Sequence, residues 1–277
     1  MTEPEPIIPQ ARPGEMDERP IEAIQMAAKD FDSIASDYAF FMAHATEAES
    51  DVTEYARVLA GFAEGRTLIR MLDFGCGTGD FSRRLISTLN WPPQLLRMTL
   101  VEPVRHHREE ASRRLAAYSH DTIESLESLP SAREPQFDLV LSNHALYYVD
   151  DLEATLLRMS ELLNPAGELL LAIAGWDNIL LQLWKTGFAM LGRPVPYYTS
   201  EDVEAILFQR GAKFQKSKAY YQLRFPNTTE NRQKILRFLF GDHLQAITPQ
   251  RLLGEFDRYV HGNHIEVNTS SDHFAVE

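Results

Sequence analysis

The chain has 277 residues, of which 44% are hydrophobic and 24% charged, and its formal net charge is −13. This length is enough for one large domain whose core needs no disulfides. A single cysteine, Cys76, excludes an intramolecular disulfide framework, and no apolar run reaches the roughly 20 residues that span a bilayer. The excess of 40 acidic over 27 basic residues argues against a nucleic-acid substrate. We therefore expect a cytoplasmic protein without nucleic-acid or membrane partners.

The N-terminal part divides into a tail and two predicted helices. Residues 1–20 are rich in proline and acidic residues, and such a composition buries too little apolar surface to fold. We predict a disordered acidic tail there. Apolar residues then recur every three to four positions over 21–41, and a second helix is predicted over 45–63. We assign 21–66 to N-terminal helices that cover a substrate pocket.

Short apolar runs alternate with helical patterns in the middle of the chain. The runs cover 68–74, 97–102, 137–142 and 167–174, and a helical pattern follows each of the first three. Continuous apolar strands separated by helices indicate an α/β fold with a parallel sheet covered on both faces. Ligands of such sheets bind at the carboxyl ends of the strands. We therefore assign 67–175 to a ligand-binding core.

Beyond Trp176 the alternation is less regular. A helix is predicted over 200–211 with Ser200 as its N-cap, and a final strand is predicted over 265–275. We assign 176–262 to a substrate-binding lid region and 263–277 to the strand that closes the core sheet.

A glycine-rich turn follows the first predicted strand. The segment Asp73-Phe74-Gly75-Cys76-Gly77-Thr78-Gly79 is followed by a predicted helix, so glycines let the backbone approach a ligand at a helix N-terminus. Glu102 ends the next strand, where a carboxylate can accept both hydroxyls of a ribose. A structural turn is the alternative interpretation of the glycines alone. Together the two features predict an adenosine ligand without a 2′-phosphate.

The glycine turn and Glu102 resemble those of class I methyltransferases that use S-adenosylmethionine, over about residues 68–175. The resemblance implies a Rossmann-like sheet of seven mostly parallel strands with the last strand antiparallel. It also implies S-adenosylmethionine as cofactor, S-adenosylhomocysteine as product, and no metal. Gly75 and Gly77 would approach the methionyl part, Glu102 the ribose, and residues 122–124 the adenine. The implied cofactor-binding residues are Asp73, Gly75, Cys76, Gly77, Glu102, His107, Thr122, Ile123, Glu124 and Asn143.

Three further segments, around His44–Glu47, Leu146–Leu156 and Gly175–Ser200, resemble histamine N-methyltransferases. The chain departs from that family where His144 replaces a glutamine and in the lid between Trp184 and Tyr197. These departures leave histamine itself open as the acceptor. The resemblance implies that the amine pocket is lined by Glu47, His144, Tyr147, Trp176 and either Asn268 or Thr269.

Glu47 and His144 are the candidate catalytic residues. Glu47 can anchor an ammonium or imidazolium, and the alternative is a solvated acid at a helix start. His144 can accept a proton, since the ordinary pKa of histidine lies in the working range, or it can be an ordinary loop residue. Methyl transfer requires an aligned, deprotonated acceptor and the exclusion of water.

Aromatic residues cluster after the later predicted strands. Tyr147, Tyr148, Trp176 and Tyr197 can hold a cation by their ring faces, and Tyr38 can close the pocket. Core packing is the alternative for each, and for Tyr148 and Trp184 it is the favoured interpretation.

The sequence thus predicts a methyltransferase that acts on a nitrogen of a small cationic amine or imidazole-like molecule. The alternative acceptor is a carboxylate or hydroxyl, for which Arg193 and Arg224 are the candidate partners. A protein that binds S-adenosylmethionine without turnover is the second alternative. Zinc-hydrolase, serine-hydrolase and P-loop motifs are absent from the sequence. We expect a monomer or a weak homodimer.

Overall fold

The computed structural model describes residues 29, 31–131, 136–247 and 249–277. The predicted tail over 1–20, and residues 21–28 and 30 of the helix predicted over 21–41, lie outside these residues; in the described part of that segment the helix begins at Ala35. Within the described part, no helix is long and apolar enough to cross a membrane.

One mixed sheet forms the centre of the molecule, with the strand order β3-β2-β1-β4-β5-β8-β6 and the short β7 paired to β8. Strands β1 to β5 are parallel, whereas β8 runs antiparallel to both of its neighbours. This arrangement confirms the predicted α/β, Rossmann-like fold with its antiparallel last strand. The strands are β1 (Ile69–Phe74), β2 (Leu96–Val101), β3 (Glu124–Leu126), β4 (Phe137–Asn143), β5 (Leu163–Ile173), β6 (Phe214–Pro226), β7 (Val260–His261) and β8 (His264–Val276).

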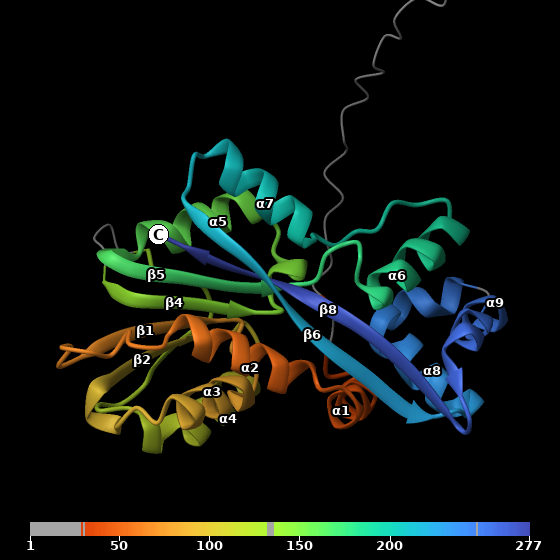
Figure 1. Ribbon diagram of the computed structural model, residues 1–277, viewed down its shortest axis with the longest axis horizontal. Helices are drawn as coiled ribbons and strands as arrows, with labels where there is room; N and C mark the ends of the chain where they lie inside the picture. Colours follow the sequence, from red (N-terminus) through yellow and green to blue (C-terminus); the bar gives the residue numbers. More distant parts are fainter. Residues whose placement is uncertain (1–28, 30, 132–135, 248) are drawn as a thin grey trace, which may run out of the picture.

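Helices cover both faces of this sheet (Figure 1). One face carries α2 (Glu47–Val58), α3 (Asp80–Leu89) and α4 (Arg105–Leu115), and the other carries α5 (Leu152–Glu161) and α7 (Ser200–Gln209). The strands between them are almost fully buried, as continuous apolar runs predict.

The hairpin formed by β6 and β8 extends well beyond the sheet. Strand β5 pairs only with residues 272–276 of β8, whereas β6 pairs with β8 along its whole length, residues 264–276. The projecting half of the hairpin is surrounded by a separate group of helices (Figure 1). These are α1 (Ala35–His44), α6 (Ile179–Met190), α8 (Thr229–Phe240) and α9 (Pro249–Gly254). The hairpin therefore connects the sheet to the helices that surround the predicted acceptor pocket.

Three sequence-based assignments differ from the structure. The strand β6 lies inside 176–262, which the sequence assigned wholly to the lid region, and it is part of the central sheet. The N-cap of α7 is Thr199 and not Ser200, because the Thr199 hydroxyl and the Asp202 carboxylate form a reciprocal capping box. The second helix, predicted over 45–63, is shorter and spans Glu47–Val58.

Candidate active site

The glycine turn joins β1 to α3 at the carboxyl edge of the sheet. Gly75 has a φ of +71°, and an added Cβ would lie 2.2 Å from the Cβ of Ala145, so only glycine fits this position. At Gly77, by contrast, an added Cβ would meet nothing within 4 Å. The turn is therefore tightly packed on one side and open on the other, which is the arrangement that a ligand-binding turn requires.

Glu102 lies directly against this turn and is 8% exposed. One carboxylate oxygen accepts a hydrogen bond from Gly77 N at 3.1 Å, and the other accepts one from Val104 N at 3.0 Å. Each oxygen keeps a second lone pair, so the carboxylate can still accept hydroxyl groups of a ribose.

Asp73 and Asn143 border the same edge. Asp73 is buried and accepts a hydrogen bond from Ser82, and burial raises its pKa to about 7 even though that hydrogen bond opposes the shift. The Oδ1 atom of Asn143 is buried and has no hydrogen-bond partner among the described residues. A buried acceptor without a partner suits a donor group of a ligand. The open turn, the Glu102 lone pairs and Asn143 together fit S-adenosylmethionine.

Cys76 lies inside the turn and is buried. Burial raises the pKa of its thiol far above the ordinary value, so the sulfur stays protonated at neutral pH. This state agrees with a packing role.

The predicted adenine-contacting segment is not at this edge. Thr122 and Ile123 precede β3, and Glu124 is its first residue and accepts a hydrogen bond from the Thr99 hydroxyl at 3.0 Å. These residues therefore lie at the amino end of the strand, and the prediction placed the segment too early. The carboxyl edge begins at Leu126, whose carbonyl accepts a hydrogen bond from Glu102 N at 3.0 Å.

His107 lies in the first turn of α4 and faces the N-terminal segment. Its Nε2 is 3.5 Å from Oδ1 of Asp32, and Nε2 of the adjacent His106 is 3.0 Å from the same oxygen. The structure thus places His107 beside a carboxylate of the segment that precedes α1.

Helix α2 brings three functional side chains to one face. Glu47, Asp51 and Tyr55 are four residues apart, so they lie one above the other along the helix. The start of the helix is fixed to β6 by two hydrogen bonds, from Thr46 N to Gln222 O at 2.9 Å and from Gln222 N to Thr46 Oγ1 at 3.0 Å. These bonds hold Glu47 beside the projecting hairpin.

His144 is the centre of a hydrogen-bonded cluster at the end of β4. Its φ of +55° is unusual for a residue other than glycine and directs the imidazole toward α2. The Nε2 atom lies 2.9 Å from Oδ2 of Asp51 and 3.8 Å from Oε1 of Glu47, and Nδ1 lies 3.1 Å from the Tyr147 hydroxyl. That hydroxyl also accepts a hydrogen bond from Ala174 N at 2.7 Å. The structure therefore brings Glu47, His144 and Tyr147 together, as the sequence predicts.

Asp51 and His273 belong to the same cluster, and the sequence analysis missed both. Asp51 is fully buried, and its second oxygen lies 2.9 Å from Nε2 of His273 on β8. Asp51 thus holds two imidazoles at once. Its spacing of four residues from Glu47 is a signal that could have identified it, because both side chains then share one helix face.

Charge interactions set the protonation states of this cluster. Burial lowers the pKa of His144, but the nearby Glu47 and Asp51 carboxylates more than offset this and raise it to about 9. Burial acts to raise the pKa of Asp51, yet the hydrogen-bonded His144 and His273 bring it to about 2. For Glu47, burial raises the pKa, while His144 and a hydrogen bond from Tyr221 oppose the rise. At neutral pH His144 is therefore protonated and acts as a hydrogen-bond donor. The sequence predicted His144 as a proton acceptor, but Glu47 is better suited to that role.

The ligand atoms of Glu47, Asp51 and His144 also lie within 4.8 Å of one another, close enough for a metal ion. Since Asp51 and His144 already form a direct hydrogen bond, we describe the group as a hydrogen-bonded cluster.

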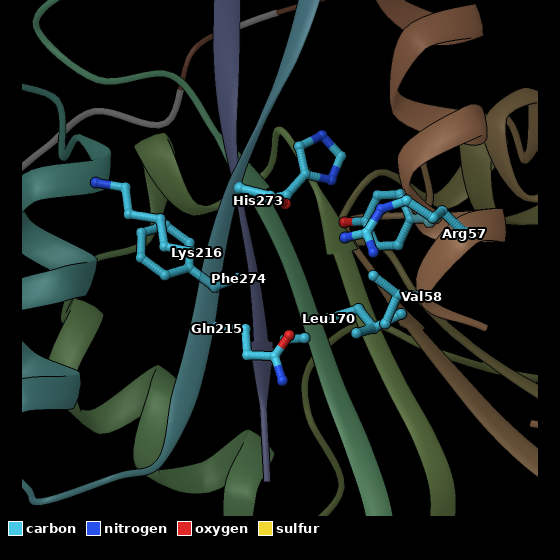
Figure 2. A pocket seen from close by; sticks show the side chains of 10 residues that line it. Arg57, Val58, Leu170, Gln215, Lys216, His273 and Phe274 are labelled. Atoms are coloured by element: carbon cyan, nitrogen blue, oxygen red, sulfur yellow. The ribbon is translucent and has the colours of Figure 1, made fainter. Parts of the chain in front are cut away.

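A cavity of about 140 Å³ lies next to His273, on the side of α2 and the sheet (Figure 2). Tyr55, Arg57 and Ser217 are among the residues that line it. In Figure 2 the imidazole of His273 and the side chain of Arg57 lie on the same side of the hairpin, whereas Lys216 points to the opposite side. His273 therefore lines this cavity and also contacts the buried Asp51 through its Nε2 atom.

Aromatic rings form a wall beside the cluster. The Tyr147 ring packs edge-on to Trp184 at 5.7 Å, and Trp184 packs on Tyr197 at 4.6 Å. Trp184 is buried and donates to Leu239 O at 2.8 Å, which agrees with core packing. Tyr148 is half-buried and contacts both Tyr147 and Tyr197.

Trp176 and Tyr38 are the remaining predicted pocket residues. Trp176 is partly buried, and its backbone N–H donates to Glu201 at 2.8 Å. Tyr38 is 39% exposed and packs against Phe31 and Phe238, but burial of its hydroxyl and the nearby Glu47 carboxylate raise its pKa to about 12.

Thr269 and Asn268 on β8 differ in orientation. Thr269 pairs with Tyr221 across the hairpin, and its hydroxyl accepts a hydrogen bond from Ile179 N at 3.0 Å. Asn268 is exposed and accepts a hydrogen bond from Gln222 at 3.2 Å. Of the two alternatives, Thr269 therefore shares a face with Tyr221, and Asn268 lies on the opposite face of the hairpin. Both border an open cleft along β6 and β8.

Comparisons with known proteins agree with this fold. The chain is 32% identical to malonyl-acyl-carrier-protein O-methyltransferase of Enterobacter lignolyticus, covering 43% of the chain and 45% of the relative. It is 26% identical to carnosine N-methyltransferase 2 of Gallus gallus, covering 63% and 60%. It is 25% identical to histamine N-methyltransferase of Xenopus tropicalis, covering 59% and 61%. The chain thus spans about half to three-fifths of the length of these relatives.

Solved structures show the same fold at low sequence identity. YcgJ from Bacillus subtilis superposes with a TM-score of 0.53 at 15% identity, covering 81% of this chain and 98% of that one. The plantazolicin methyltransferase BpumL, solved with S-adenosylhomocysteine, gives a TM-score of 0.52 at 11% identity and covers 90% of each chain. The family described as a methyltransferase domain matches residues 43–216. Because this match spans more than half of the sequence, the chain belongs to the methyltransferase domain family.

Proposed function

We propose that the protein transfers the methyl group of S-adenosylmethionine to a nitrogen of a small cationic amine or imidazole-like molecule. The observation that carries this proposal is the buried cluster on α2. Asp51 is paired with both His144 and His273, whereas Glu47 lies 3.8 Å from His144 and is not its direct hydrogen-bond partner. The Glu47 carboxylate is therefore the one available to a singly charged cation.

The residues of the cluster have different roles in binding and deprotonating such an acceptor. S-adenosylmethionine, when bound, supplies an electrophilic methyl group on a sulfonium. Glu47 binds the ammonium and accepts one of its protons, because burial raises the pKa of this carboxyl toward the working range. That proton transfer breaks an N–H bond, forms an O–H bond on Glu47 and frees the nitrogen lone pair for in-line attack. His144 and Tyr221 stabilise the ionised Glu47 before the transfer.

The aromatic wall completes the pocket. Tyr147 and Tyr197 exclude water and present ring faces and edges to the acceptor side. The cofactor part of the proposal rests on the open glycine turn and on Glu102, whose lone pairs remain available to a ribose. The acceptor cluster around Glu47, which cofactor binding alone does not require, favours an active enzyme over a protein that only binds the cofactor.

O-methylation is the second candidate, and the likeness to malonyl-acyl-carrier-protein O-methyltransferase favours it. A carboxylate acceptor requires a cationic partner in the pocket. The two arginines considered for this role lie elsewhere. Arg224 forms an ion pair with Glu266 at 2.8 Å on the exposed hairpin, and Arg193 is exposed in the loop after α6.

The test uses a labelled methyl donor and a panel of biogenic amines, imidazoles, small acids and phenols. We expect label transfer to a nitrogen, and Glu47→Gln should lower kcat/KM at least 100-fold while the affinity for S-adenosylhomocysteine is retained. Glu49→Gln is the matched control, since Glu49 lies on the same helix but is exposed and paired with Arg84. Transfer to acids or hydroxyls only, with Glu47→Gln fully active, would refute the proposal.

A further inference from the structure

Lys29 lies in a box of aromatic rings next to the acceptor site. Its Nζ atom is 4.5 Å from the centroid of the Phe238 ring, 5.3 Å from that of Phe31 and 5.7 Å from that of Tyr148. It also donates a hydrogen bond to the backbone carbonyl of Phe238, in the last turn of α8. Carbonyls at a helix C-terminus attract cations, so the position of this ammonium is well defined.

This ammonium has no carboxylate partner among the residues that the structure describes. The ring faces and one carbonyl hold it in place, but they do not neutralise its charge. Burial lowers its pKa from 10.5 to about 7. An ammonium has three N–H donors, of which the Phe238 carbonyl uses one, so donors remain for a ligand.

A continuous row of side chains connects Lys29 to Glu47. The Tyr148 ring is part of the Lys29 box and packs against Tyr147 at 5.6 Å. The Tyr147 hydroxyl lies 3.1 Å from His144, whose other ring nitrogen lies 3.8 Å from Glu47. Among the described residues, one aromatic wall thus has a carboxylate at one end and, at the other, a lysine without a carboxylate partner.

We propose that Lys29 binds a carboxylate of the methyl acceptor, so that the substrate is a zwitterion of the amino-acid or small-peptide class. The inference rests on the proposed function, since the cationic nitrogen of the same molecule binds at Glu47. Each charged end of such a molecule meets the opposite charge on the protein. With a plain amine bound, no carboxylate of the described residues would balance the charge of Lys29, so the plain amine is the poorer ligand.

Matched pairs of ligands that differ only by a carboxylate test this proposal. Binding of histidine and histamine, and of tyrosine and tyramine, is measured by calorimetry on the full chain saturated with S-adenosylhomocysteine. We expect the carboxylated member of a pair to bind at least tenfold more tightly, the range of a charged hydrogen bond. Lys29→Met should bring the ratio close to one and leave the affinity for the plain amine unchanged.

Lys234→Met is the matched control. Lys234 also lies over an aromatic ring, 4.9 Å from the centroid of Phe40, but it pairs with Glu230 on the surface, so this variant should keep the wild-type ratio. A direct measurement uses NMR of the Lys29 side chain, where added acetate should raise its pKa above 7 in the absence of any amine.

Several results would overturn the proposal. Equal affinity for both members of each pair, or no response of Lys29 to acetate, would exclude a carboxylate site. Tighter binding of the plain amines to Lys29→Met would instead mean that Lys29 competes with cationic ligands for the aromatic box. The acetate titration tests the carboxylate site alone, because it does not depend on Glu47. A failure of the proposed amine site would show separately: wild type and Glu47→Gln would then bind the plain amines with the same affinity.

Discussion

Replacing Asp51 by asparagine tests whether this buried carboxylate keeps His144 charged. Attraction to Asp51 and Glu47 raises the pKa of His144 from 6.5 to about 9 in spite of burial, which corresponds to about 3 kcal/mol of stability. A raised pKa contributes stability that is fully present below pH 6.5 and is lost as the pH rises through 9. The contribution of His144 to the free energy of unfolding of the wild type should therefore fall by about 3 kcal/mol over this window, while groups with other shifts, such as Lys29, add their own pH dependence.

The pKa shift of Asp51, the partner of His144, corresponds to a free energy of similar size. Its pKa falls from 3.8 to about 2, which corresponds to about 2 kcal/mol that is lost as the pH falls from about 4 through 2. The two figures describe one attraction from its two ends and are not added. Glu47 still raises the pKa of His144 in Asp51→Asn, so this variant should lose only part of the roughly 3 kcal/mol at pH 6.5, and less at pH 9.5.

The assay is urea denaturation followed by tryptophan fluorescence at pH 6.5 and pH 9.5. Groups that titrate alike in both proteins cancel in the comparison. Asp151→Ala is the control, because Asp151 caps α5 through a 2.9 Å bond from Ala154 N, and its loss should cost about 1 kcal/mol at both pH values. A full wild-type pH dependence in Asp51→Asn would refute the assignment of the His144 charge to Asp51.

Two further substitutions test the cofactor turn and the acceptor site. Gly75→Ala places a Cβ 2.2 Å from that of Ala145, so the affinity for S-adenosylhomocysteine should fall at least tenfold, as measured by calorimetry. Gly65→Ala is the control, because Gly65 also has a positive φ, +72°, but a Cβ there would meet no atom within 4 Å. This variant should retain the affinity. Tyr221→Phe removes a hydrogen bond that lowers the pKa of Glu47, so the acid limb of the kcat/KM profile should move to higher pH. An unchanged limb would mean that Glu47 does not bind the acceptor in its ionised form.

The cofactor half of the fold was predictable because its signals are local. A strand, a glycine turn and a helix follow one another within about twenty residues, and the three glycines of the turn have the positive φ that glycine adopts most readily. The same reasoning failed for residues 122–124, because the polar run there does not mark where β3 begins. A strand of three residues is too short for its alternation of buried and exposed residues to fix where it begins.

The acceptor half depends on contacts between distant parts of the chain. Asp51 and His273 are separated by 222 residues, and no local pattern predicts that contact. The hairpin strand β6 did carry a signal, because Ala219, Tyr221 and Leu223 are buried and alternate with more exposed residues. Glu47 and His144 were candidates from the sequence. Which of them carries the proton depends on their pKa values, and these depend on burial in the folded chain.

The placement of Glu47, Asp51 and Tyr55 on successive turns of α2 has an evolutionary consequence. In the proposed function, Glu47 and Asp51 of this helix take part in acceptor binding, whereas the glycine turn joins β1 to α3. Substitutions on this helix face would then change the preferred acceptor without changing the turn that is proposed to bind the methyl donor. Homologues with other acceptors should differ first at these helix positions. A mutant library that aims at a new acceptor can therefore be kept smallest by varying these positions.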